Sequence, residues 1–192
     1  MILNHLSRWA AFVSVAIGCV TAWASPAYSQ TYFELGGGWT YLTQTGPSSS
    51  GTYSHGINGR VSVGQEIAPN LRIRLDVVGI QFNRNVQYFP PCASPGCTRP
   101  YYTTQSNDVV GVVANGLVNV DPRGILYLIG GPGLYSASVP SAEWHVGVSA
   151  GAGITVPVGA RLRAFTEARW HYLFGSTTGP SQLFPITVGL RY

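Results

Sequence analysis

Hydrophobic side chains recur at every second position in eight segments of the chain, which is the period of a β-strand with one apolar face. The clearest example covers residues 143–156, where the apolar positions are Trp144, Val146, Val148, Ala150, Ala152, Ile154 and Val156. The same alternation marks residues 31–42, 53–63, 71–77, 107–120, 125–135, 161–174 and 184–192. The pattern predicts an all-β chain of eight strands.

Two of these segments are less regular. Residues 125–135 are apolar on both faces and contain Pro132. Beyond Val77 the phase of the third segment is unclear, and we expect a β-bulge near Val77 and Val78 that shifts it.

Long and short connections alternate between the segments. The short ones are EIAPN, DPRG and PVGA, and longer ones, such as residues 83–105, lie between them. Brief periplasmic turns and longer outer loops alternate in this way in membrane barrels. We therefore predict an eight-stranded antiparallel up-and-down transmembrane β-barrel with both termini on the periplasmic side.

Composition indicates which face of the strands meets lipid. Hydrophobic residues make up 45% of the 192 residues, and charged residues only 9%, against about 25% in ordinary soluble domains. A soluble, lipocalin-like periplasmic carrier is the alternative, but its surface would consist mostly of Gly, Ser, Thr and Asn. The net charge of +4 comes from arginines scattered singly along the chain, which argues against nucleic acid as a partner.

The charged residues of the strands share the polar face, which becomes the lumen. A register slip would move arginines into lipid at about 2 to 4 kcal/mol each. Because the first and last strands adjoin in a closed barrel, we predict that Glu34 approaches Arg191, and that Glu167 and Asp76 lie among arginines. The expected lumen charge network is Glu34, Arg60, Arg72, Arg74, Asp76, Arg163, Glu167, Arg169 and Arg191.

Aromatic residues fall at the strand ends, as in the two interfacial belts of membrane barrels. Those expected beside the longer loops are Trp39, Tyr41, Tyr53, Trp144, Trp170, Tyr172 and Phe184. Phe33 and Tyr192 are expected at the opposite end.

Residues 1–29 have the layout of a cleaved secretory signal peptide, with an apolar run from Trp9 to Ala24 and small residues after it. Cleavage before Ser25 or before Gln30 fits these small residues. The alternatives are an N-terminal membrane anchor and a lipidated Cys19. The expected mature domain is the barrel of residues 30–192.

Cys92 and Cys97 lie close together in the stretch PPCASPGCTRP. In an exported chain this pair predicts a local disulfide. No site residue is expected to bind a metal, since no further ligand has suitable spacing, and no cofactor is expected.

The chain ends in FPITVGLRY, with Phe184, Ile186, Val188, Leu190 and Tyr192 on one face. This ending resembles the assembly signal of bacterial outer-membrane proteins. The mature chain is similar to the small OmpA/OmpX-type eight-stranded barrels, and VGVSAGAGI and FTEARWHYLFG resemble their penultimate hairpin. The resemblance implies the bacterial outer membrane as location, contact with its lipid and lipopolysaccharide, and recognition of the last strand by the outer-membrane assembly machinery.

The resemblance also implies a membrane-anchored scaffold, with a polar lumen filled by side chains and any recognition carried by the outer loops. Tyr88, Phe89, Tyr101 and Tyr102 are the candidate contacts to an extracellular ligand or host surface. The enzyme alternative is a lipid A-modifying barrel. His145 and Ser149 share a face but lie about 13 Å apart along a strand, so we expect no catalytic residues and no enzyme.

Overall fold

The computed structural model describes residues 30–43, 54–88, 101–137, 143–175 and 181–192. The predicted signal peptide, the cysteine pair and Phe89 lie outside these residues, as does Tyr53. Within the described ranges no helix is long and apolar enough to cross a bilayer.

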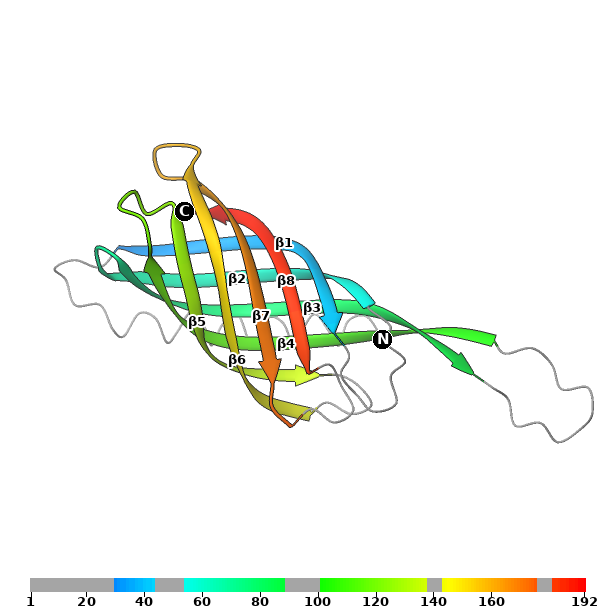
Figure 1. The fold of residues 1–192 in the computed structure, drawn as a ribbon. Helices are drawn as coiled ribbons and strands as arrows, with labels where there is room; N and C mark the ends of the chain where they lie inside the picture. The colour runs from blue at the N-terminus through cyan, green and yellow to red at the C-terminus, as the bar shows by residue number, and fades with distance from the viewer. Residues whose placement is uncertain (1–29, 44–53, 89–100, 138–142, 176–180) are drawn as a thin grey trace, which may run out of the picture.

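Eight strands form one closed antiparallel barrel, in which each strand pairs with the next and the last pairs with the first (Figure 1). The strands are β1 (Thr31–Thr43), β2 (Ser54–Ala68), β3 (Leu71–Tyr88), β4 (Tyr101–Asn119), β5 (Leu126–Ala137), β6 (Glu143–Pro157), β7 (Arg163–Leu173) and β8 (Gln182–Arg191). The predicted eight-stranded up-and-down barrel is confirmed.

The connections separate the barrel into two ends. The turn end holds the short connections 69–70, 120–125 and 158–162, together with the start of β1 and the end of β8. The loop end holds the connections between β1 and β2, β3 and β4, β5 and β6, and β7 and β8. Three of them are longer than every connection at the turn end, but 138–142, between β5 and β6, is shorter than 120–125. The predicted alternation of short and long connections is therefore present except at 138–142.

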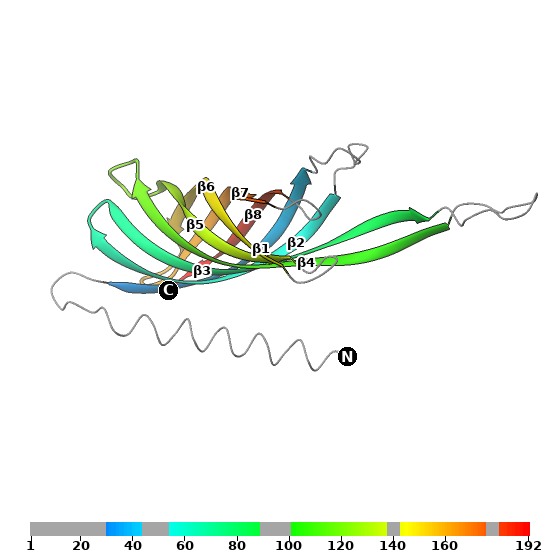
Figure 2. The same ribbon diagram turned by 90° about the horizontal axis from the view of Figure 1, so that it is seen from below.

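β3 and β4 continue beyond the barrel wall at the loop end (Figures 1 and 2). They remain paired from Asn83 opposite Ser106 to Tyr88 opposite Tyr101, whereas the pairing of β3 with β2 ends at Phe82. We call residues 83–88 and 101–106 the β3–β4 ribbon. The expectation of a connection over residues 83–105 was wrong for this part of the chain, and the candidate contacts Tyr88, Tyr101 and Tyr102 lie in strands.

The alternation of β3 runs without interruption through Val77 and Val78, so the expected bulge there is absent. The irregularity of the β2–β3 pairing lies instead between Glu66 and Ala68, beside the turn. In the unshifted phase the apolar side chains of Val78, Ile80 and Phe82 face the lumen.

The outer surface of the barrel wall is apolar. Leu35, Ile57, Val146 and Leu128 are each more than half exposed in the isolated chain, although all are large hydrophobic residues. Exposed aromatic side chains lie near both ends of the strands: Trp39, Tyr41, Trp144, Trp170 and Phe184 toward the loop end, and Phe33 and Tyr192 at the turn end. Such a surface is stable when hydrocarbon covers it.

Candidate functional site: the barrel lumen

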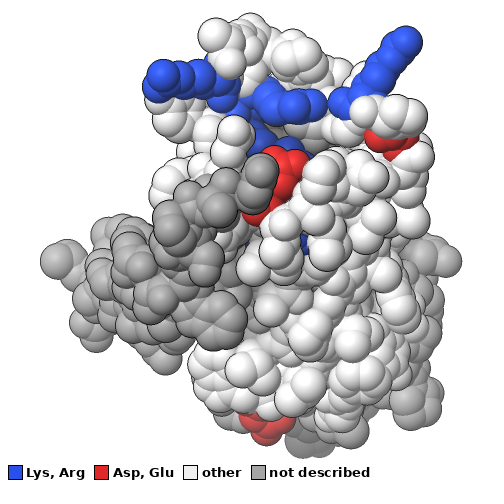
Figure 3. Space-filling model, turned by 90° about the vertical axis from the view of Figure 1, so that its left-hand side faces the viewer, with Lys and Arg blue, Asp and Glu red and all other residues white. Residues whose placement is uncertain are grey.

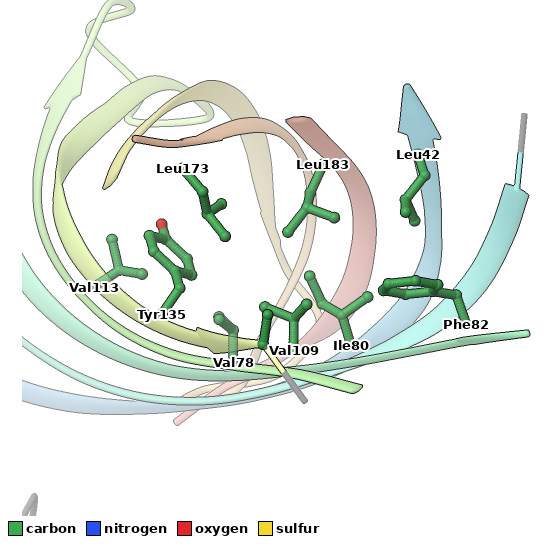
Figure 4. Packing of buried hydrophobic residues seen from close by; sticks show 10 residues of the cluster. Leu42, Val78, Ile80, Phe82, Val109, Val113, Tyr135, Leu173 and Leu183 are labelled. Carbon is green, nitrogen blue, oxygen red and sulfur yellow. The ribbon is translucent and has the colours of Figure 1, made fainter. Parts of the chain in front are cut away.

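The lumen is divided into two layers with different chemistry. The layer toward the loop end is apolar and is filled by side chains from several strands, which point toward one another in Figure 4. Its buried members are Leu42, Val78, Ile80, Phe82, Val109, Val113, Tyr135, Ala137, Leu173 and Leu183. The layer toward the turn end carries the charged residues. The sequence predicted a polar lumen, and the structure places the charged residues in one layer of it and an apolar cluster in the other.

Glu34 of β1 is an acceptor for three arginines. Arg60 donates from Nη2 at 3.0 Å, Arg74 from Nη1 at 2.7 Å and Arg191 from Nε at 2.6 Å. Arg191 reaches Glu34 because β1 and β8 are paired in a register that places the two residues directly opposite each other. The Glu34 side chain is completely buried.

Glu167 of β7 forms the second centre. It is bound by Arg60 and Arg169, and Arg74 donates from Nη2 to Glu167 Oε2 at 2.9 Å. The hydroxyl of Tyr127 donates to the same oxygen at 2.8 Å. Arg60 and Arg74 therefore connect Glu167 to Glu34 across the lumen.

Asp76 of β3 is the third carboxylate. Arg74 Nε lies 2.8 Å from Asp76 Oδ1, and Arg169 forms an ion pair with Oδ2. Asn115 donates from Nδ2 to Oδ2 at 2.8 Å, and Ser149 in turn donates from Oγ to Asn115 Oδ1 at 3.0 Å. The amide and hydroxyl thus extend the charged network to β4 and β6.

All nine residues of the expected network face the lumen, and the structure brings seven of them into one set of ion pairs: Glu34, Arg60, Arg74, Asp76, Glu167, Arg169 and Arg191. Arg72 is buried but contacts a neutral partner, Asn119 Oδ1, at 2.6 Å. Arg163 is half-buried, and it takes part in none of these ion pairs.

Sequence reasoning missed the role of Tyr127, which satisfies Glu167. Tyr127 lies in the segment that is apolar on both faces. It was therefore counted as an apolar residue, and its hydroxyl group was not considered as a hydrogen-bond donor. The signal that could have found it is the burial of a tyrosine, because a buried phenol needs a hydrogen-bond partner.

Ser149 and His171 are directly opposite each other on β6 and β7, a neighbour relation that the sequence argument about His145 did not consider. Ser149 donates to Asn115 and not to His171, whereas His171 Nδ1 is 2.7 Å from the hydroxyl of Tyr135. A serine hydrolase needs a hydrogen bond between serine and histidine. The described residues hold no such bond, and they hold no group of three metal-ligating side chains.

A small cavity lies where the two layers meet. It has a volume of about 10 Å³ and is bordered by Arg60, Val78, Arg169 and His171, among others. This is room for about one water molecule. Buried side chains of both layers surround this cavity.

No protein-family model and no curated protein sequence matches the chain. Solved structures share its fold. Neisserial surface protein A is 14% identical with a TM-score of 0.59, over 86% of this chain and 98% of that one. A major outer membrane protein from Thermus thermophilus is 13% identical with a TM-score of 0.52, over 84% of this chain and 98% of that one.

The apolar outer wall, the closed pairing of all eight strands and the shared architecture lead to one conclusion. In a closed barrel the backbone N–H and C=O groups of the wall are paired between neighbouring strands, so the wall has no free edge. This pairing is required in lipid, where no water is present to bind unpaired groups. The chain is a small eight-stranded transmembrane β-barrel with the fold of bacterial outer-membrane proteins.

Proposed function

We propose that this barrel is a non-catalytic surface scaffold that presents the β3–β4 ribbon outside the cell for contact with an extracellular ligand or a host surface. In this proposal the turn end and both termini lie in the periplasm, and the loop end faces outward. The packed lumen supports an anchoring role, because an ordered path for solutes would need open volume along the barrel axis.

The observation that carries the proposal is the length of the ribbon. Six cross-strand pairs, from Asn83–Ser106 to Tyr88–Tyr101, continue past the last pair that β3 makes with β2. At about 3.3 Å per residue, they extend roughly 20 Å beyond the wall.

Within the described residues, neither outer edge of the ribbon is paired with another strand. The main-chain groups at these edges can accept an extended segment of a partner.

The test is a chain in which residues 84–105 are replaced by Asn-Gly, a sequence that favours a tight hairpin turn. We expect this variant to fold and to show a shift in gel mobility on heating, as the parent protein does. Bacteria that carry the variant should lose their adhesion to surfaces. The matched control replaces residues 176–180, at the same end of the barrel, by Gly and Ser. Unchanged adhesion of the ribbon variant, with its amount in the membrane equal to that of the parent, would contradict the proposal.

Orientation has its own test. An epitope inserted in the connection 176–180 should be detected by antibody on intact cells, whereas the same epitope inserted after Pro122 should be detected only after permeabilisation. The reverse result would overturn the assignment of the ends.

Two further expectations belong to the same proposal. Recognition of the last strand by the assembly machinery predicts that Tyr192→Ala lowers the amount of barrel in the outer membrane of cells but not the yield of refolding in detergent. A disulfide between Cys92 and Cys97 predicts a mass increase of two hydrogens when the exported protein is reduced.

A further inference from the structure

Three arginines converge on the lumen at the turn end. Arg72, Arg163 and Arg191 come from β3, β7 and β8, and all three face inward. Arg163 and Arg191 are directly opposite each other on paired strands, an arrangement that is unfavourable for like charges.

The counter-charge at this position is insufficient. Glu34 lies 2.6 Å from Arg191 Nη2, but Glu34 also neutralises Arg60 and Arg74. The contacts of the Arg72 guanidinium are with uncharged groups, since it lies 5.2 Å from the centre of the Tyr127 ring and donates to Asn119.

Arg163 makes no ion pair with the described residues. Glu66 is the register partner of Arg72, yet the two side chains form no ion pair within 4 Å. Among the residues that the structure describes, Arg72 and Arg163 therefore have no carboxylate within ion-pairing distance.

Hydrogen-bond donors are also left over. Arg72 Nε, Arg163 Nε and the hydroxyl of Tyr32 are buried and have no hydrogen-bond partner among the described residues. Arg72 is only 6% exposed and Tyr32 only 8%. The guanidinium carbon of Arg191 lies over the ring of Tyr32, 4.6 Å from the centre of that ring. Buried donors without an acceptor are costly. A bound anion would accept hydrogen bonds from these donors and would also balance the charge of the arginines.

The surface around these residues is favourable for an anion. Figure 3, which views the turn end, shows basic side chains gathered across the upper part of this face, with acidic side chains fewer among them. Arg123 and Arg161 are exposed on the two turns 120–125 and 158–162. A surface with a cluster of positive charge raises the local concentration of anions.

We propose that the turn-end mouth of the lumen, formed by Tyr32, Arg72, Arg163 and Arg191, binds a phosphate group. Guanidinium groups bind phosphate through paired N–H donors, and a phosphate has enough oxygens to accept from two arginines and a phenol at once. The mouth lies at the end of the membrane-spanning strands, at the level of lipid headgroups. The phosphate can therefore come from a phospholipid of the adjoining leaflet or from a soluble phosphate compound.

The experiment uses the mature barrel, refolded in a maltoside detergent that contains no phosphate. One arm titrates inorganic phosphate and measures ³¹P line broadening and calorimetric heat at constant ionic strength with chloride. The other arm reconstitutes the barrel with phosphatidylglycerol and measures, by native mass spectrometry, the lipid that is retained when the detergent is exchanged.

The variant Arg163→Gln removes a charge that no described acid balances, so the fold should tolerate it. We expect phosphate affinity or lipid retention to fall by about tenfold or more, as for the loss of a hydrogen bond to a charged group. Arg163→Lys should restore part of the binding. Arg84→Gln, which removes the same charge from the ribbon at the other end of the barrel, should have no effect.

Binding in the first arm alone identifies a soluble phosphate compound, and binding in the second arm alone identifies a lipid headgroup. Either result supports the site. Absence of binding in both arms, or equal binding by the Arg163→Gln and Arg84→Gln variants, would overturn it.

Discussion

Glu34 is the shared counter-charge of three arginines in the lumen. Arg60, Arg74 and Arg191 all donate to its two oxygens, and its side chain is inaccessible to solvent. A buried ion pair gives little net stability compared with apolar packing, but removal of one partner leaves the other charge unbalanced at a high cost. The network is therefore sensitive to the loss of a single carboxylate.

At this scale we predict that Glu34→Gln lowers the free energy of unfolding by about 3 to 5 kcal/mol, because three arginines lose their shared counter-charge. The measurement is urea unfolding in phospholipid vesicles, followed by tryptophan fluorescence. Glu66→Gln is the control, since Glu66 forms none of the ion pairs of the network. Equal effects of the two substitutions would show that the network has no special role.

At the scale of elements, the junction of β1 and β8 closes the barrel through glycines. A Cβ atom added at Gly38 would lie 1.9 Å from the carbonyl oxygen of Ile186, and one added at Gly189 would lie 2.2 Å from that of Leu35. Hydrogen bonds in both directions between Phe33 and Tyr192, each of 2.9 Å, complete the junction. The close approach of the two strands thus explains the glycines at these positions.

We predict that Gly38→Ala destabilises the closed barrel by about 1 to 3 kcal/mol, or by more where the backbone cannot move. The fraction of refolded protein with the heat-modifiable mobility of the closed form measures the effect. Gly59→Ala is the matched control on β2, because a Cβ there meets no atom within 4 Å. If both variants refold equally well, the glycines of β1 have another explanation.

At the scale of the whole molecule, the apolar outer wall determines which residues lie at the middle of the bilayer and which lie near its surface. Ala150 is exposed and lies midway along β6, whereas Val156 is exposed near the turn end of the same strand. The cost of an arginine on the lipid-facing side depends on depth, from about 2 to 4 kcal/mol at the midplane to about 0 to 1 kcal/mol near the interface.

Accordingly, Ala150→Arg should destabilise the barrel in vesicles by about 2 to 4 kcal/mol, and Val156→Arg by less than half as much. Unfolding in urea at several lipid chain lengths gives both values. A similar cost at the two positions would contradict the placement of the bilayer around the middle of the strands.

Much of this architecture could be predicted from the alternation of side chains. The period of two identified eight strands, and the parity of the connections indicated which of them were neighbours. The same alternation assigned Glu34, Asp76, Glu167 and their arginines to the inner face. Residues 83–88 were assigned to a connection because their polar sequence shows no alternation, and pairing with β4 overrides that weak local preference.

The sequence by itself determined the class of fold and the inner and outer faces, because both follow from a strand period that is local along the chain. The contact between Glu34 and Arg191 was predicted from sequence and is confirmed, because the first and last strands must adjoin in a closed barrel. Only the tertiary structure decided which other inward residues meet, since contacts such as Glu34 with Arg74 and Glu167 with Tyr127 depend on distances between strands. It also decided that Val78, Ile80 and Phe82 belong to an apolar layer, and that Arg72 and Arg163 form no ion pair with a carboxylate of the described residues. The physical reason is that ion pairing and packing depend on distances across the lumen, which the order of residues does not contain.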